Sequence, residues 1–107
     1  MQFNQGSDYR LKDELNYDFD ATSLVKKIKP VQFKWKADAD AGTDTGFIAH
    51  ELQEIHPFAV SGEKDALRGD GEIAPQGVDP SKLVGLLTKA LQEALVRIDA
   101  LEAAGSA

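Results

Sequence analysis

The sequence contains no cysteine, and it has one methionine and one tryptophan among 107 residues. Without cysteine there is no disulfide framework, no thiol nucleophile and no cysteine-ligated zinc site, which excludes the disulfide-stapled class of small secreted domains. No apolar run approaches the roughly 20 residues that span a bilayer, and residues 1 to 10 lack the basic-then-apolar order of a signal peptide. We therefore expect a soluble domain with no membrane partner.

Basic residues are also few: 12 lysines and arginines face 18 acidic residues, for a formal net charge of −6. A surface of this sign repels phosphate backbones and anionic lipids unless a local basic patch compensates. The densest basic cluster is Lys26, Lys27 and Lys29, which lies in what reads as an ordinary helix. We therefore expect no nucleic-acid partner.

The first half of the chain predicts two helices and one strand in a single domain. Residues 20 to 30, DATSLVKKIKP, combine an N-cap candidate, apolar residues at helical spacing and a final proline, which predicts a helix of two to three turns. Alternating apolar and polar residues at 31 to 36 predict a strand. After an acidic, glycine-containing turn at residues 37 to 46, an apolar stripe from Phe47 to Ile55 predicts a second helix. Phe33, Trp35 and Phe47 are expected in the core.

The second half predicts a loop and a long helix. Phe58 and Val60 could form a short second strand, and residues 61 to 77 hold four of the nine glycines, which indicates a loop. Asp79 is an N-cap candidate, and Pro80 suits the first position of a helix that continues to about Ala104. The fold class expected is α+β, with a small mixed helix and strand part followed by a long C-terminal helix.

The C-terminal helix carries apolar residues spaced alternately three and four apart, which is a heptad pattern. About 25 residues at about 1.5 Å each make a rod roughly 37 Å long, too long for a core this small to cover. The pattern favours packing against other chains, and the alternative is a core helix packed on its own sheet. The predicted seam consists of Val84, Leu87, Leu91, Ala94, Ile98 and Leu101.

Metal-binding patterns are weak. The acidic loop that begins at Asp38 has Thr43 and Ala49 where the calcium loop of an EF-hand requires glycine and glutamate. His50 and His56 are six residues apart, which does not place two ligands on one helix face. We expect neither a metal nor a cofactor.

Five motifs occur in an order that resembles a known family. They are SDYRLK at 7 to 12, PVQFKWK at 30 to 36, GFIAHELQEIHPFAV at 46 to 60, VDPSKL at 78 to 83 and LLTKALQEALVRIDALE at 86 to 102. Together they resemble the C-terminal intramolecular chaperone domain of phage tail spikes and fibres, the S74 self-cleaving peptidase family. The resemblance extends from Ser7 to about Glu102.

The resemblance implies a homotrimer, joined by a trimeric coiled coil of the C-terminal helix, that helps an upstream fibre or spike to fold and then cuts itself off. It places the scissile bond between Gly6 and Ser7. Residues 1 to 6 would be the end of the fibre or an artificial extension, 7 to 79 the globular part, 80 to 104 the trimerisation helix and 105 to 107 a tail. The expected location is the host cell cytoplasm during phage assembly.

The chemistry of residues 7 to 12 can be argued separately. A serine hydroxyl needs a base, and a lysine serves as one when burial or a nearby positive charge keeps it neutral. Ser7 and Lys12 are five apart, so about one turn of helix would bring them together. Ser7 Oγ could then attack the carbonyl of Gly6, in its own or a neighbouring chain. The alternative is an N-capping Ser7 with Lys12 in solvent.

Two departures and two rival functions complete the prediction. His50 stands where the family often has glutamine, and it could modulate the proton chemistry or have no effect. Pro80 stands where many members have tyrosine, and it suits a helix start. The rivals are a non-catalytic trimerisation cap and a receptor-binding tip, both of which would stay attached to the fibre.

Overall fold

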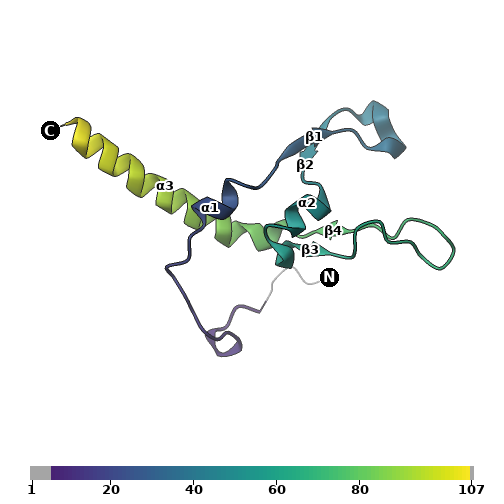
Figure 1. Ribbon diagram of the computed structural model, residues 1–107, viewed down its shortest axis with the longest axis horizontal. Helices are drawn as coiled ribbons and strands as arrows, with labels where there is room; N and C mark the ends of the chain where they lie inside the picture. Colours follow the sequence, from purple (N-terminus) through teal and green to yellow (C-terminus); the bar gives the residue numbers. More distant parts are fainter. Residues whose placement is uncertain (1–5, 107) are drawn as a thin grey trace.

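The protein consists of short helices and two-stranded ladders arranged along one long C-terminal helix (Figure 1). The computed structural model describes residues 6 to 106. Its elements in chain order are η1 (Tyr9–Leu11), α1 (Thr22–Val25), β1 (Val31–Phe33), η2 (Lys36–Ala41), β2 (Asp44–Gly46), α2 (Ala49–Gln53), η3 (Pro57–Ala59), β3 (Val60–Ser61), β4 (Gly77–Val78), η4 (Pro80–Leu83) and α3 (Val84–Gly105), where η marks a 3-10 helix. This mixture of helix and strand with a long last helix confirms the α+β class.

The long helix begins and ends close to where the sequence predicts. Asp79 caps its entry by accepting a hydrogen bond from the Ser81 amide at 3.0 Å, and Pro80 occupies the first turn. That turn is the 3-10 helix η4, and α3 continues it for 22 residues. Because neither glycine nor proline occurs between positions 86 and 104, nothing breaks the helix before Gly105.

The helix predicted at residues 20 to 29 is shorter than expected, because α1 is one turn long. After Val25 the backbone tightens: the amides of Lys27 and Ile28 bond to carbonyls three residues back instead of four. Pro30 then disfavours a helical conformation at Lys29. The predicted second helix is also shortened, since residues 47 and 48 lie before the start of α2.

The strand β1 pairs with a strand that the sequence did not indicate. It aligns antiparallel with β2, with Val31 opposite Gly46 and Phe33 opposite Asp44. The segment forming β2 reads Asp-Thr-Gly and has no apolar alternation, so its pairing depends on the partner strand rather than on its own pattern. The expectation that this segment is only a turn is therefore wrong.

The prediction that Trp35 belongs to the core is also wrong. β1 ends at Phe33, and the Trp35 side chain is 58% exposed. Its ring packs edge-on against Phe33 with 4.9 Å between centroids, and its indole nitrogen donates to Asp44 at 3.1 Å. Phe33 is half-buried, and Phe47 is partly buried against the core.

The glycine-rich loop extends from a second, smaller ladder. β3 pairs with β4, with Val60 opposite Val78, and residues 62 to 76 project between them as an arm with one internal bridge, Leu67 to Ile73 (Figure 1). Phe58 belongs to η3 instead of a strand, and its side chain is 85% exposed. The expected second strand therefore consists of Val60 and Ser61.

Little of the described chain is buried. Its core consists of the five aliphatic residues Ala21, Leu52, Ala59, Leu83 and Leu86. The accessible surface is 9011 Å² for 11.6 kDa, whereas a compact monomer of this mass exposes about 5,800 Å². The radius of gyration is 18.5 Å, compared with about 13 Å for a compact domain of this length. The extended shape therefore leaves much apolar surface in solvent.

Among the described residues, no helix is both long and apolar enough to cross a membrane.

We predict that Leu52→Ala destabilises the fold far more than Phe58→Ala. Leu52 is 2% exposed at the contact of α2 with the core, so truncation should leave a cavity and lower the free energy of unfolding by about 2–5 kcal/mol. Phe58 is largely exposed, and its truncation should change that free energy by about 0.5 kcal/mol or less. Urea unfolding followed by circular dichroism at one chain concentration measures both, and equal effects would contradict this account of the core.

Candidate active site

Ser7 and Lys12, the two residues of the predicted dyad, are in direct contact. The Lys12 Nζ atom donates a hydrogen bond to Ser7 Oγ at 2.7 Å. Between them η1 forms one turn of 3-10 helix, in which the Leu11 amide bonds to the Asp8 carbonyl at 3.0 Å and the Lys12 amide to the Tyr9 carbonyl at 3.2 Å. The turn folds the chain back so that residues five apart meet.

The turn is held by an Asp8–Arg10 pair that the sequence analysis did not single out. Asp8 is the N-cap of η1 and accepts from the Arg10 amide at 2.9 Å. The guanidinium of Arg10 grips the same carboxylate with two bonds, of 2.9 and 2.7 Å. The bonds from the Arg10 side chain are the main cause, and the bond from its amide a further one, that the pKa of Asp8 lies below its usual value. Because Asp8 is the cap, Ser7 Oγ remains available to Lys12, and the N-cap alternative for Ser7 does not apply.

The signal for this pair was present in the sequence. An aspartate directly before a turn, with an arginine two residues later, offers both an N-cap and a fork-shaped donor for its carboxylate. Attention to the Ser-to-Lys spacing alone misses it.

Gly6 lies against the turn on the other side of Ser7. A side-chain carbon added at Gly6 would lie 3.2 Å from Leu11 Cδ1, which is tighter than ordinary contact. Glycine therefore suits the residue before Ser7, because a larger side chain there would press on Leu11. The preceding residues, 1 to 5, lie outside the described residues, so the predicted upstream segment is represented by Gly6 alone.

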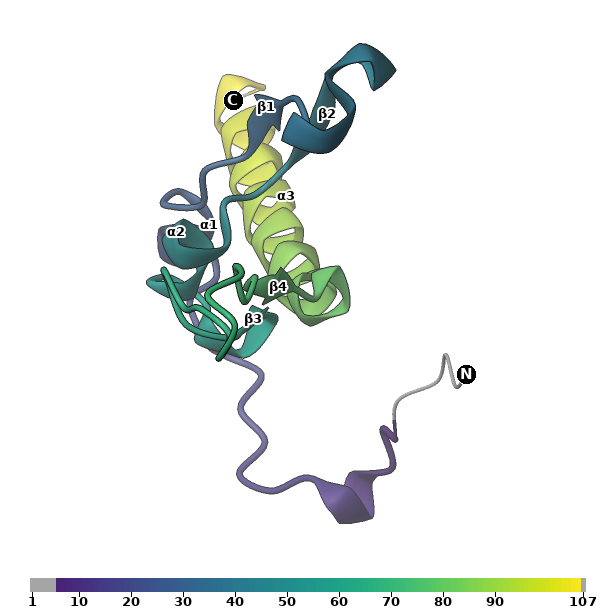
Figure 2. The same ribbon diagram turned by 90° about the vertical axis from the view of Figure 1, so that its right-hand side faces the viewer.

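The pair lies on an exposed arm, apart from the folded body. Every residue from 6 to 20 is exposed, and Figure 2 shows this segment, in purple, extending away from α2 and α3. Burial disfavours the charged form of a lysine, and the neutral amine is the form that can accept a proton. A single chain supplies the contact between Lys12, the predicted base, and Ser7, the predicted nucleophile, but no burial of that contact.

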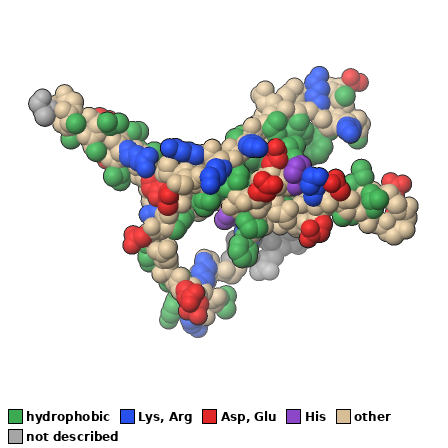
Figure 3. Space-filling model, viewed as in Figure 1, with side chains coloured by type: hydrophobic (Ala, Val, Ile, Leu, Met, Phe, Trp, Pro, Cys, Tyr) green, Lys and Arg blue, Asp and Glu red, His purple; other side chains and the backbone are tan. Residues whose placement is uncertain are grey.

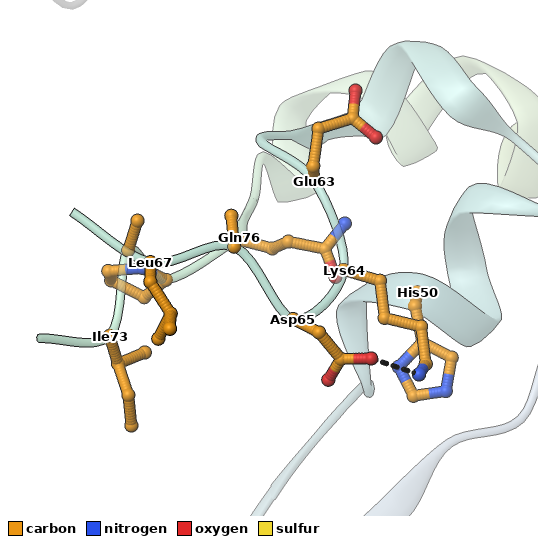
Figure 4. Close-up of a pocket in the computed structure, with 10 residues that line it drawn as sticks. His50, Glu63, Lys64, Asp65, Leu67, Ile73 and Gln76 are labelled. Atoms are coloured by element: carbon orange, nitrogen blue, oxygen red, sulfur yellow. Dashed lines mark hydrogen bonds and ion pairs between the residues drawn. The ribbon is translucent and has the colours of Figure 1, made fainter. Parts of the chain in front are cut away.

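His50, the predicted modulator, occupies another part of the molecule. It belongs to α2, and Figures 1 and 2 both show α2 apart from η1. Its neighbours lie at the base of the 62–76 arm, where Lys64 pairs with Asp65 at 2.6 Å (Figure 4). Within one chain, His50 is not brought to the Ser7–Lys12 pair.

The surroundings of His50 do not form a metal site. The hydrogen bond from Lys64 lowers the pKa of Asp65, with smaller contributions from the charges of Lys64 and His50. Over residues 6 to 106, no group of three or more histidine or carboxylate side chains is placed to hold a metal ion.

The predicted trimer seam is exposed along α3. Its large apolar members range from 45% to 72% exposed, and Figure 3 shows hydrophobic side chains along the helix toward the C-terminus. The exposed members are Val84, Leu87, Leu91, Ile98 and Leu101. Ala94 is also exposed, and it lines a crevice between α3 and α1. The core contacts of the helix come from another face, through Leu83, Leu86 and Ala90.

We predict that the turn around Ser7 depends on the Asp8 carboxylate. Because the pKa of Asp8 is lowered in the fold, its contribution is fully present above the usual aspartate value near 3.9 and is lost as the pH falls through the lowered pKa. The Arg10 amide resonance should shift in that acid range and, in Asp8→Asn, at neutral pH. Asp18→Asn, on the same exposed arm, is the control. An Arg10 resonance insensitive to Asp8→Asn would contradict the prediction.

Comparison with known proteins agrees with the motifs. The sequence model of the family Peptidase_S74, described as the chaperone of endosialidase, matches residues 7 to 61, about half of the chain. The match begins at Ser7, the residue in contact with Lys12. No curated protein matches the chain. The chain belongs to the Peptidase_S74 family, the chaperone of endosialidase.

Proposed function

We propose that this domain is an intramolecular chaperone that promotes folding and homotrimerisation of an upstream phage tail fibre or spike, and then releases itself by cutting the Gly6–Ser7 bond. The observation that carries the proposal is the 2.7 Å contact between Lys12 Nζ and Ser7 Oγ at the first residue of the family match. The domain would act in the host cell cytoplasm while the phage assembles.

The proposed reaction has two steps. Neutral Lys12 takes the proton of the Ser7 hydroxyl while Oγ attacks the Gly6 carbonyl carbon. The peptide C–N bond breaks, and Lys12 passes the proton to the departing Ser7 amine, which leaves an ester between Gly6 and Ser7 Oγ. Water then hydrolyses the ester to the Gly6 carboxylate and the free hydroxyl. No other reactant is needed, and each chain reacts once.

Apolar surface left in solvent supports the trimer. The seam along α3 repeats at heptad spacing, and the chain as a whole exposes far more area than a compact monomer. The arm that carries the dyad also exposes Tyr9, Leu11, Leu15 and Tyr17. Both regions need a covering surface, and neighbouring copies of the chain provide one.

Assembly would then regulate cleavage. Packing residues 6 to 20 against a neighbouring chain would desolvate Lys12 and favour the neutral amine, the form able to act as base. Cleavage would follow correct trimerisation and would not precede it.

The main rival is a trimerisation cap without catalysis, which stays attached to the fibre. The exposure of Ser7 and Lys12 in the single chain favours it, because no part of the described chain covers the pair. The two functions differ in whether a fragment beginning at Ser7 is produced.

We predict that a precursor with an upstream fibre releases a fragment whose first residue is Ser7. Ser7→Ala removes the nucleophile and Lys12→Ala the base, so each should slow release by about a thousandfold or more. Mass spectrometry of the purified precursor over time measures the fragment. Lys34→Ala, an exposed lysine outside the arm, is the control and should release at the parent rate. Absence of the Ser7 fragment from the parent, or parental rates in both variants, would support the attached cap.

We predict that Leu91→Glu blocks assembly and, with it, cleavage. Leu91 lies in the middle of the seam and is 60% exposed, so the substitution should leave the single chain folded while placing a charge in the coiled-coil core. Sedimentation of the Leu91→Glu variant should show a monomer, and release of the Ser7 fragment from its precursor should fall to near zero. A monomeric variant that still cleaves at the parent rate would refute the coupling between assembly and cleavage.

A further inference from the structure

An apolar crevice lies between α1 and α3, beside the predicted seam. It measures about 370 Å³, and its floor is formed by Ala90 and Ala94 on α3, facing Thr22 and Val25 on α1. Lys26 and Arg97 flank it. The small alanine side chains leave room next to the helix, and nothing in the described chain fills it.

The crevice is held in shape by a bond between the two helices. The Glu93 carboxylate accepts hydrogen bonds from the Thr22 amide at 2.8 Å and from its hydroxyl at 2.5 Å. The Thr22 side-chain bond is the main cause of a pKa below the usual value for Glu93, so the carboxylate stays ionised at neutral pH. α1 is thereby fixed on one side of α3, and the crevice exists before any partner arrives.

The heptad register identifies what would meet this crevice in a second copy. With Val84, Leu91 and Ile98 at the a positions, Ala90 and Arg97 fall at g, and Leu95 and Glu102 fall at e. In parallel helices in register, each g residue faces the e residue of the following heptad in the neighbouring chain. Ala90 therefore faces a neighbour's Leu95, and Arg97 faces a neighbour's Glu102.

Both pairs are complementary. Leu95 is 49% exposed, and in this parallel arrangement it would lie opposite the floor of a neighbour's crevice, where two alanines leave space. Arg97 and Glu102 carry opposite charges, and neither belongs to any of the three ion pairs found among residues 6 to 106. An antiparallel pairing would instead set g against g and e against e, so the two charges would not meet.

We propose that the α1–α3 crevice is the docking site for Leu95 of a second copy of this chain, with Arg97 of one copy paired to Glu102 of the next, so that the helices associate parallel and in register. This inference rests on the proposed homotrimer and specifies its interface. It makes α1 part of that interface and so ties the globular part to the helical stem.

Sedimentation equilibrium of the full chain tests the contact made by Leu95. Leu95→Ala should raise the apparent dissociation constant by about tenfold or more, since a buried leucine is lost from each interface. Val96→Ala is the matched control: Val96 is the next residue, is 67% exposed, lies away from the seam, and should leave the constant unchanged. Equal effects of the two variants would overturn the proposal.

A charge exchange tests the partner of Arg97. Arg97→Glu and Glu102→Arg each set like charges together, and each should raise the apparent dissociation constant of the assembly by about tenfold. The double variant should restore a dissociation constant close to that of the parent. If the double variant is no better than the single ones, Arg97 does not face Glu102 of a neighbour and the register is wrong.

Cross-linking tests the orientation independently. Because the chain has no cysteine, a single Leu101→Cys substitution gives one thiol per chain. Parallel, in-register helices bring these thiols together near the end of the stem, and mild oxidation should link two chains. Absence of the link in an assembled sample would show another orientation and overturn the proposal.

These results are distinguishable from the outcome of the cleavage experiment. An assembly that is insensitive to Leu95, Arg97 and Glu102 refutes this interface while leaving the chaperone and its self-cleavage standing. An assembly that responds as expected, from a precursor that never releases a Ser7 fragment, supports the interface and refutes the autoproteolysis.

Discussion

Five buried aliphatic residues hold the described chain together, and the remaining features depend on how little they cover. They join α1, α2, η3 and η4 to the first turns of α3, and the Glu93 bonds to Thr22 tie α1 to the middle of the helix. The rest of α3, the 62–76 arm and the N-terminal segment 6–20 extend beyond this core. A burial this small contributes little against the conformational entropy of 107 residues. In the proposed homotrimer, neighbouring copies would bury more of this apolar surface.

The contact between Ser7 and Lys12 is formed within a single chain, but it is not buried there. One 3-10 turn, capped by Asp8 and clamped by Arg10, is enough to set Lys12 Nζ against Ser7 Oγ. The segment around this pair is exposed throughout, so the single chain supplies the short distance without burial. The proposed cleavage therefore depends on surroundings that one described chain does not supply.

The features that could be predicted from the sequence are those whose physical cause is local. The Asp79–Pro80 start of the last helix and the turn that joins Ser7 to Lys12 follow from caps and spacing over a few residues. The features that could not be predicted depend on a partner elsewhere in the chain. β2 has no strand pattern and forms because β1 offers its edge, and Trp35 satisfies the alternation of a core residue yet lies past the end of the strand. In the absence of a large core, apolar alternation does not guarantee burial.

The family could be identified from motifs that occur in order along the sequence. The long heptad helix could be predicted as well, because helix periodicity and caps depend on neighbouring residues. The tertiary structure decided which face of that helix is used within the chain. Leu86 and Ala90 turn toward the core while Leu91 and Leu95 remain in solvent, although all four are apolar and adjacent in the pattern. That choice depends on where α1 and α2 dock, and docking is set by long-range contacts such as Glu93 with Thr22 that no local pattern encodes.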